Sequence, residues 1–161
     1  MKSITIILLL LFTSTLGLSQ APTSLIGRDS INHRLLDSLI IVVVNMKRSE
    51  IKVPALKYNP VIFKFAYDHG VWMSANDKYE HSNPAASEYA ECIAAGFMWE
   101  RTSYIEEAKL IVNGWMDSPR HREILLDKQY TECGTHTHEY IDKYIKSSLY
   151  GFDVKSTFCL N

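Results

Sequence analysis

The clearest structural signals in the chain lie in residues 103–122, which read SYIEEAKLIVNGWMDSPRHR. Ser103, followed three residues later by Glu106, is the capping-box pattern that begins a helix. After it, apolar residues recur at helical spacing: Ala108, Ile111, Val112 and Trp115. Ser118 is a common helix-capping residue, and Pro119 directly after it is typical of a first helical position. The stretch therefore predicts two consecutive helices, the second of them short.

Two further helices are predicted upstream of this stretch. From residue 31 to about residue 49, apolar residues fall at helical spacing: Leu35, Leu36, Leu39, Ile40, Val43 and Val44. Residues 40–44 are all β-branched, so from the residues alone a buried strand is equally compatible with this run. The second helix is predicted to begin at Pro60 and to end near residues 75–76. One stripe of side chains runs along it: Ile62, Phe65, Ala66, His69 and Met73.

Strand-like runs surround these helices, at about residues 91–97, 131–138 and 149–158. Residues 52–59 read as an irregular connection. Helices interleaved with a small, mostly antiparallel sheet are typical of the α+β class. A chain of 161 residues is long enough for one ordinary domain with its own hydrophobic core, and we find no internal repeat or linker in it.

The first 19 residues have the three regions of a secretory signal peptide. Lys2 precedes an apolar run at residues 4–12, and Gly17 and Ser19 place small residues three and one positions before a possible cleavage point. The apolar stretch is shorter than the roughly 20 residues of a spanning helix, although an uncleaved anchor is the alternative. Residues 20–30 read as a leader. We therefore expect an exported protein with no stable membrane span after cleavage, and its destination can be the medium (secreted), the periplasm or the cell surface.

The charge pattern argues against a nucleic-acid partner. The formal net charge is −1, with 17 basic and 18 acidic residues. The two signs are interspersed along the chain and form no basic run, whereas a basic patch or stripe is the electrostatic signature of nucleic-acid binding. We therefore expect no nucleic-acid binding.

The chain has three cysteines, Cys92, Cys133 and Cys159. In an oxidising compartment one pair can close, and the third thiol is then left over or pairs between chains. The sequence alone does not determine the pairing. We predict a disulfide between Cys133 and Cys159, because the segments that carry them look like two late strands that could form a hairpin with these residues near one end.

Two histidines and one glutamate form the candidate site: His81, His121 and Glu91. His121 falls in the first turn of the predicted short helix, where the positive end of the helix dipole disfavours the imidazolium and leaves a neutral ring. A neutral imidazole is the form that binds a divalent metal. Glu91 can accept a hydrogen bond from one of the rings or be a ligand itself. Zinc (Zn²⁺) is the common metal that this donor set suits best.

The other histidines are weaker candidates. His136 and His138 alternate on a predicted strand, so they share one face of it. We expect that face to be a polar outer face, with a surface metal pair as the alternative. His69 lies on the stripe of the second helix, and we expect a hydrogen-bonded core histidine there rather than a ligand.

Five short motifs carry a resemblance to a known family. They are Asn45-Met46-Lys47-Arg48, His81-Ser82, Ala90-Glu91-Cys92, Trp115 to Arg122, and Thr157-Phe158. In this order and at this spacing, residues 36–158 resemble the CAP or SCP domain shared by cysteine-rich secretory proteins, antigen 5 and pathogenesis-related 1 proteins, in its bacterial form. The resemblance implies that residues 31–161 form one domain, a three-layer α-β-α sandwich, and that residues 31–49 are helical.

The resemblance also implies a pocket that two histidines and two acidic residues line. Carried over to this chain, the histidines are His81 and His121, and the first acid is Glu91. The position of the second acid falls on or near Ser118, so three of the four groups are present. We therefore predict a pocket formed by His81, Glu91, His121 and Ser118.

For function, the resemblance implies a secreted, non-enzymatic module whose pocket binds a small ligand, a lipid, a peptide or a divalent metal. The sequence has neither the G-x-S-x-G pattern of a nucleophile elbow nor the H-E-x-x-H pattern of a metallopeptidase. The alternative is a peptidase-like hydrolase, with Glu91 as the base, the two histidines as metal ligands or acid-base groups, and water as the nucleophile. The missing second acid weighs against this alternative.

Overall fold

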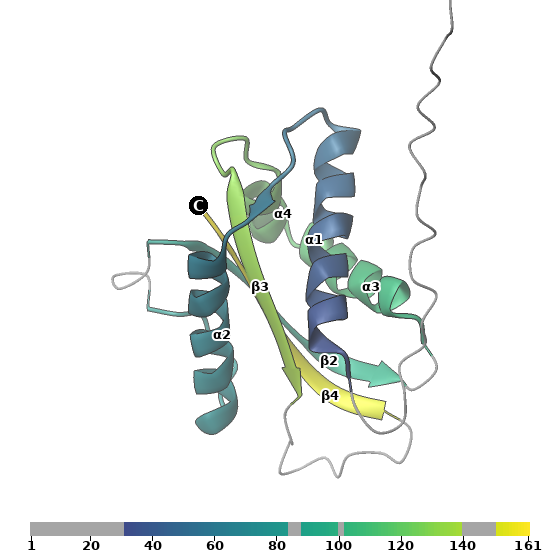
Figure 1. The fold of residues 1–161 in the computed structure, drawn as a ribbon, viewed down its shortest axis with the longest axis vertical. Helices are drawn as coiled ribbons and strands as arrows, with labels where there is room; N and C mark the ends of the chain where they lie inside the picture. The colour runs from purple at the N-terminus through teal and green to yellow at the C-terminus, as the bar shows by residue number, and fades with distance from the viewer. Residues whose placement is uncertain (1–30, 84–87, 100–101, 140–150) are drawn as a thin grey trace, which may run out of the picture.

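The computed structural model describes residues 31–83, 88–99, 102–139 and 151–161, and the predicted signal peptide and leader lie outside this part. The described residues form four helices and four strands: α1 (His33–Glu50), β1 (Lys57–Tyr58), α2 (Pro60–Ala75), β2 (Ala90–Trp99), α3 (Tyr104–Asp117), α4 (Pro119–Leu126), β3 (Glu132–Glu139) and β4 (Gly151–Leu160). The helices lie on both faces of the sheet, α2 on one face and α1 with α3 on the other (Figure 1). The predicted α+β class and three-layer sandwich are confirmed.

The described strands form one sheet in the order β1-β3-β4-β2. β2 and β4 are antiparallel over their full lengths, from Ala90 opposite Leu160 to Trp99 opposite Gly151. β3 is also antiparallel to β4, and the two residues of β1 are parallel to β3. The prediction of a mostly antiparallel sheet is therefore confirmed, whereas β1 falls in the segment that was predicted to be an irregular connection. β2 is one edge of the sheet, which positions the site described below.

The helices begin and end close to the predicted residues. Ser103 caps α3 as predicted, since its side chain accepts a hydrogen bond from the Glu106 backbone N–H (3.4 Å). α1 is helical through its β-branched run, because that run buries one helical stripe against α3 and the sheet. The buried apolar residues of this stripe are Leu36, Leu39, Ile40, Val43 and Val44. Burial at helical spacing thus prevails over the strand propensity of the individual residues.

Arg48 of α1 joins three parts of the chain from a fully buried position. Its guanidinium donates hydrogen bonds to four backbone carbonyl groups, those of Pro54 (2.7 Å), Leu125 (2.7 Å), Asp127 (3.0 Å) and Tyr130 (2.9 Å). The last carbonyl groups of a helix have no partner within that helix. Arg48 therefore satisfies the end of α4 while it holds the loop after α1, and this fixes where α4 lies.

α2 approaches β3 so closely that there is no room for a side chain on Gly134. A Cβ atom at this position would lie 2.1 Å from the Phe63 backbone nitrogen and 2.5 Å from the Ile62 carbonyl carbon. The start of α2 is also tied to the strand, because the Asn59 backbone N–H donates to the Cys133 carbonyl (2.8 Å). The space above Gly134 is thus filled by the backbone of the helix.

The predicted Cys133–Cys159 disulfide is wrong. Cys133 lies opposite Leu160 in the β3–β4 ladder, whereas Cys159 lies opposite Gly134. Because successive side chains of a strand point to opposite faces, the two cysteines lie on opposite faces of the sheet. All three cysteines are free and buried. Burial raises the pKa of the Cys92 and Cys133 thiols to about 12, so these groups stay protonated near neutral pH.

A reducing agent is therefore expected to leave the thermal stability of the protein unchanged. Loss of a structural disulfide typically costs about 2–5 kcal/mol, which melting curves recorded with and without dithiothreitol would reveal. A thiol-reactive dye should modify the native protein slowly and all three cysteines of the denatured protein rapidly. A melting temperature that falls by several degrees on reduction would contradict the free state of the cysteines.

The edge of β3 beyond β1 is covered by a side chain of α1. The Thr137 backbone N–H, which points away from β4, donates to Asp37 Oδ1 (2.8 Å), and Asp37 is buried. Burial raises the pKa of this carboxyl group, while the neighbouring His136 and Thr137 oppose that effect. One carboxyl group thus takes the place that a neighbouring strand would occupy in a wider sheet.

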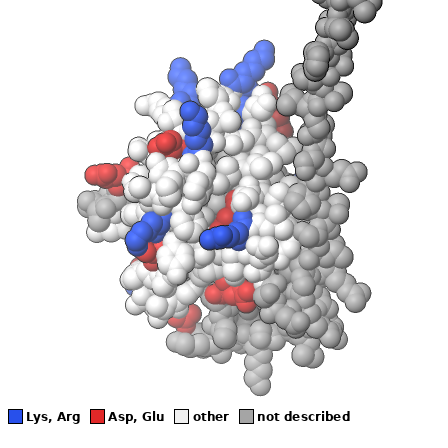
Figure 2. Space-filling model, in the orientation of Figure 1, with Lys and Arg blue, Asp and Glu red and all other residues white. Residues whose placement is uncertain are grey.

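The surface carries charges of both signs. Figure 2 shows basic and acidic side chains interspersed over one face of the molecule. Some of them form pairs one helical turn apart, such as Lys64 with Asp68 (2.6 Å) and Lys109 with Glu106 (2.7 Å). None of the described helices is both long enough and apolar enough to cross a membrane.

Candidate functional site

Glu91 is the centre of the candidate site. It lies near the start of β2, and its side chain is 5% exposed. Its Oε1 accepts two hydrogen bonds, from His81 Nδ1 (2.9 Å) and from the Ser82 backbone N–H (3.0 Å). Its Oε2 lies 3.5 Å from His69 Nε2 and has no hydrogen-bond partner among the described residues. Glu91 therefore holds the segment that carries His81 against the edge of the sheet.

His81 is oriented by this carboxylate. Because a carboxylate only accepts hydrogen bonds, His81 Nδ1 carries a proton, and in the neutral ring Nε2 keeps its lone pair. The side chain is 52% exposed, so the ring is accessible from solvent. A carboxylate that fixes the tautomer of a histidine is the arrangement in which the second ring nitrogen acts as a base or as a ligand.

His121 and Ser118 come from the beginning of α4. The ring centroid of His121 lies 5.9 Å from that of His81, with 56° between the ring planes. Ser118 is the N-cap residue of α4 as predicted, but within the described residues its side chain makes no capping hydrogen bond. Ser118 instead lines the same cavity as His121. The fold thus brings His81, Glu91 and His121 together, with Ser118 beside them.

The pKa of His121 is lower than that of a free histidine. Burial is the main cause, and the nearby His81 and Arg120 lower it further. The lowered pKa of His121 favours the neutral ring that the sequence predicts. The causes are burial and neighbouring positive charge, whereas the cause expected from the sequence was the helix dipole.

Acidification is expected to destabilise the protein partly through His121. Because the pKa of this group is lower in the folded chain than its ordinary value of 6.5, the unfolded chain binds more protons between the two values. This contribution to stability is complete above about pH 6.5 and is lost as the pH falls through the lower, folded-state pKa. The free energy of unfolding in urea, measured from about pH 7.5 to about pH 5, should therefore fall more steeply for the wild type than for His121→Gln. Parallel curves for the two proteins would contradict this assignment.

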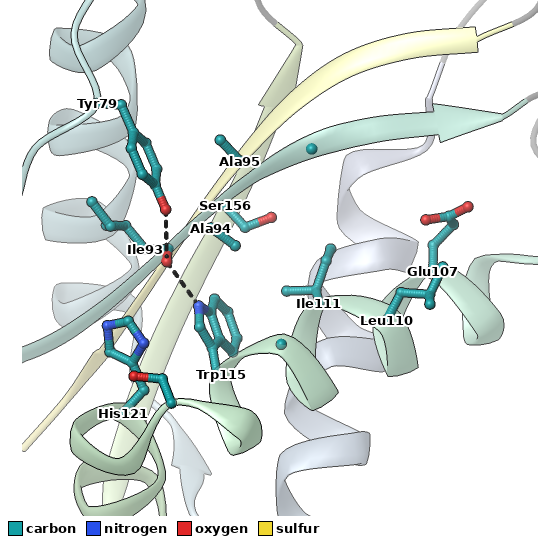
Figure 3. A pocket seen from close by; sticks show the side chains of 13 residues that line it. Tyr79, Ile93, Ala94, Ala95, Glu107, Leu110, Ile111, Trp115, His121 and Ser156 are labelled. Atoms are coloured by element: carbon teal, nitrogen blue, oxygen red, sulfur yellow. Dashed lines mark hydrogen bonds between the residues drawn. The ribbon is translucent and has the colours of Figure 1, made fainter.

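A cavity of about 420 Å³ opens beside His121, between β2, α3 and α4. Residues from one stripe of α3 form one wall: Glu107, Leu110, Ile111, Gly114 and Trp115. The facing wall is β2, with Ile93, Ala94, Ala95 and Gly96. Figure 3 shows that the ends of the cavity differ, since His121 lies at one end and Glu107 at the other. The cavity therefore has a mainly apolar middle and a polar group at each end.

Two side chains of the cavity bind the same backbone carbonyl group of β2. Trp115 Nε1 (3.0 Å) and Tyr79 Oη (3.1 Å) both donate to the Ile93 carbonyl oxygen (Figure 3). The two bonds attach α3 and the segment before β2 to the edge of the sheet at the His121 end of the cavity. They keep this end of the cavity fixed relative to the strand.

Two residues of this site, His69 and Tyr79, were not assigned to it from the sequence alone. His69 Nε2 donates to the Glu80 carbonyl oxygen (3.0 Å), and its side chain is 8% exposed, as expected for a hydrogen-bonded core histidine. It also stacks on Trp72, with 5.7 Å between ring centroids. Its position close to Glu91 depends on how α2 packs against the sheet, for which the sequence has no local signal.

A second cavity, of about 590 Å³, lies on the other side of His81. It is lined by Phe65, Asp68, His69, Trp72, Glu80, His81, Ser82 and Asn83. His81 therefore lines this second cavity, whereas His121 lines the first, and the two rings lie between the cavities. The predicted pocket residues are thus divided between two linings, with His121 and Ser118 on the first cavity and His81 on the second.

The three predicted zinc ligands do not form a three-ligand set in this arrangement. Oε1 of Glu91 already accepts from two donors, and no group of three or more His, Cys, Asp or Glu residues in the described part of the chain is placed to hold a metal ion. A protein zinc site has three or four protein ligands. Zinc ligation by His81, Glu91 and His121 stays a prediction.

The polar outer face predicted for His136 and His138 is wrong. α2 covers this face of β3, and His136 contacts the rings of Tyr67 (4.7 Å between centroids) and Phe63 (5.9 Å). The side chain of His136 is 12% exposed. The two histidines do share a face, with ring planes 11° apart, and Gly70 of α2 leaves the room that the His138 ring occupies. Alternation along a strand identifies a shared face but not what covers it.

The chain is similar to proteins of known family and structure. Residues 42–146 match the model of CAP, the cysteine-rich secretory protein family. An outer surface protein of Borrelia burgdorferi has a similar structure, with a TM-score of 0.59 and 14% identity, over 86% of this chain and 98% of that chain. An extracellular SCP-domain protein of Bacillus anthracis has a TM-score of 0.49 and 18% identity, over 78% of this chain and 40% of that chain. A cysteine-rich secretory protein of Staphylococcus aureus has a TM-score of 0.47 and 15% identity, over 80% and 39%. No curated protein matches the chain significantly.

Proposed function

The chain belongs to the cysteine-rich secretory protein (CAP) family, and from this premise we propose that it is an exported binding module. Its ligand-binding site is the cavity between β2, α3 and α4, and the ligand has an apolar body and at least one polar group. The observation that carries the proposal is the lining of this cavity, which is apolar between His121 at one end and Glu107 at the other. Apolar pockets with a few convergent polar groups are typical of small-ligand sites.

The histidines are proposed to contact the polar group of the ligand. His121 is held in its position by the start of α4, and α4 is in turn held by Arg48. His81 is held by Glu91 at 2.9 Å. Groups that are fixed before a ligand arrives bind it with a smaller loss of conformational entropy. This arrangement therefore favours selective binding over a purely apolar interaction.

Export is the second part of the proposal. It rests on the signal-peptide pattern of residues 1–19. The names of two proteins with similar folds, an outer surface protein and an extracellular protein, agree with it. Expression of the full chain in a bacterium, followed by fractionation and N-terminal sequencing, tests this part. A mature protein that keeps residues 1–19 and stays in the cytoplasm would contradict it.

Gly114 offers a direct test of the binding site. A Cβ atom at this position meets no atom within 4 Å, and the residue lines the cavity. Gly114→Leu should therefore fill the cavity while α3 stays intact, because glycine is a poor helix former. Asn113→Leu places the same side chain on the same helix outside the cavity and is the matched control.

The binding measurement is a thermal-shift screen with fatty acids, lysophospholipids, sterols, short peptides and zinc ions. A ligand present at about 100 times its Kd stabilises a protein by about 2.7 kcal/mol. We expect one class to raise the melting temperature of the wild type and of Asn113→Leu, and to have no effect on Gly114→Leu. Equal shifts in all three proteins would place the binding elsewhere, and zinc binding that survives both His81→Ala and His121→Ala would exclude the predicted metal ligands.

A hydrolase is the second candidate, and the bond between Glu91 and His81 is the observation that favours it. A histidine whose Nδ1 proton is held by a carboxylate can accept a proton from water at Nε2. Glu91→Gln keeps the size of the side chain and removes its charge. An enzyme of this kind should lose turnover of a peptide library in Glu91→Gln while its melting curve stays cooperative. Absence of turnover in the wild type would leave the binding module as the supported function.

A further inference from the structure

We propose that the occupant of this cavity is an extended peptide that pairs with the free edge of β2 through the backbone of Ala95. The proposal deepens the binding function above and rests on it. It names the class of ligand, a peptide that carries apolar side chains and a basic one, and the mode of recognition, which is the addition of a strand to the sheet.

The direction of the backbone groups follows from the bonds to Ile93. Its carbonyl oxygen accepts from Trp115 and Tyr79, so it points away from β4 and toward the edge. In an antiparallel strand the N–H and C=O groups of every second residue point to the same side. Ala95 therefore also presents its N–H and C=O to the edge, and it faces the cavity that it lines.

In the described part of the chain, the edge of β2 at Ala95 has no strand paired with it. Among the described residues no backbone group pairs with it, and β2 has a neighbouring strand on one side, which is β4. An unpaired strand edge is a template for another strand. A peptide residue opposite Ala95 would exchange two backbone hydrogen bonds with it, one in each direction.

Small residues leave room for an incoming backbone. The strand reads Ala94, Ala95, Gly96 along the cavity, and a Cβ atom on Gly96 would meet no atom within 4 Å. Gly114 on the facing helix is equally open. Neighbouring strands in a sheet lie about 4.8 Å apart, so bulky side chains at these positions would hinder such pairing.

The two ends of the cavity set limits on the peptide. At one end, Trp115 and Tyr79 already occupy the carbonyl group of Ile93, so strand pairing stops there. At the other end lies Glu107, the acidic residue among those that line the cavity. Burial raises the pKa of this carboxyl group, and a side-chain hydrogen bond with Thr102 opposes that effect. A lysine or arginine side chain of the peptide is the complementary group.

The probe is the capped pentapeptide acetyl-Val-Lys-Val-Lys-Val-amide with a fluorescent label, titrated against the full mature chain by fluorescence anisotropy. Two isomers carry two backbone N-methyl groups each, either on both lysines or on the last two valines. Methylation removes a donor from one edge of an extended peptide, so pairing through one edge should survive in one isomer and fail in the other. We expect one isomer to bind within about threefold of the parent and the other at least about tenfold more weakly, which is the loss of about 1.4 kcal/mol.

Two protein variants complete the test. Ala95→Pro removes the edge-facing N–H and no bond of the β2–β4 ladder, and should weaken binding of the parent peptide at least about tenfold. Gly114→Leu should weaken it as well, which keeps the test valid if Ala95→Pro does not fold. The Glu107→Gln variant should weaken binding of the lysine peptide, and should not weaken binding of the corresponding peptide with glutamine at both lysine positions.

The outcomes separate this inference from the proposed function. If another ligand binds in the cavity, sensitive to Gly114→Leu, while the peptide does not bind at millimolar concentration, the binding module stands and the peptide inference is overturned. Equal binding or equal loss of binding for the two methylated isomers also overturns the peptide inference, because either result means that binding does not depend on one particular edge of the peptide. If Gly114→Leu weakens the binding of no ligand class, both proposals fail.

Discussion

Replacing Arg48 with alanine is expected to lower the free energy of unfolding by about 4 kcal/mol or more. The guanidinium is fully buried and donates to four carbonyl groups, which belong to the loop after α1 and to the end of α4 and beyond. Alanine would leave these carbonyl groups without a donor and would leave a cavity in their place. The total stability of a domain is about 5–15 kcal/mol, so the variant should be close to unfolding.

The measurement is urea unfolding followed by circular dichroism, with thermal unfolding as a second probe. A loss of this size corresponds to a fall in melting temperature of roughly 10–20 °C for a domain of this length. Lys47→Ala, at the neighbouring position, is the control, and should change stability by less than about 0.5 kcal/mol because its ion pair with Glu50 is on the surface. Arg48→Lys should fall between the two, because an ammonium group cannot reach four acceptors as a planar guanidinium does. A stable Arg48→Ala variant would show that the four bonds contribute little.

Gly134→Ala is expected to destabilise the protein by about 3 kcal/mol, although it adds a single methyl group. The added Cβ would lie 2.1 Å from the backbone nitrogen of Phe63, and backbone of a helix cannot move aside as a flexible side chain can. α2 would have to shift away from β3 and would open the smaller hydrophobic cluster. The expected loss of stability comes from this steric clash and not from the backbone conformation of Gly134, since no glycine in the described part of the chain has a positive φ.

Two other glycines are matched controls for this prediction. Gly114→Ala should stabilise the protein by about 0.5–1 kcal/mol, because the position is helical and its Cβ meets no neighbour. Gly96→Ala, also in open space but on a strand, should have a small effect. The same substitution is thus expected to have opposite signs at positions 134 and 114. Equal effects at both would refute the close approach of α2 to β3. The three variants can be compared in one set of urea titrations.

The helices could be predicted from the sequence because their signals are local. Ser103 and Pro60 each mark a helix start within one residue, and apolar stripes give the length of each helix. α1 is the instructive case. Its β-branched run 40–44 permitted a strand, and the resemblance to a known family, rather than propensity, favoured the helix that the structure has. The reason is physical, since burial of a helical stripe depends on a partner, α3, that is more than 50 residues away in the chain.

Features that depend on register or on a covering element could not be predicted. The disulfide prediction was wrong because a shift of one residue in the strand register changes the face that a cysteine occupies. Nothing in the sequence near Cys133 or Cys159 determines that register. The prediction of a polar outer face at His136 was wrong for a related reason, since α2 covers that face. β1 was missed because two residues are too few for a pattern. The site followed the same rule, because His81, Glu91 and His121 were identified but the packing of His69 against them was not.

The bond between Asp37 and the Thr137 backbone N–H has a consequence for the behaviour of the protein at high concentration. β1 pairs with two residues of β3. If the rest of this edge of β3 were uncovered, it could pair with a strand of a second copy of the chain. One carboxyl group prevents this by occupying the donor at 2.8 Å. We therefore expect solubility at high protein concentration to depend on this buried side chain of α1. A protein of this design can remain dispersed without a fifth strand, provided that α1 stays docked.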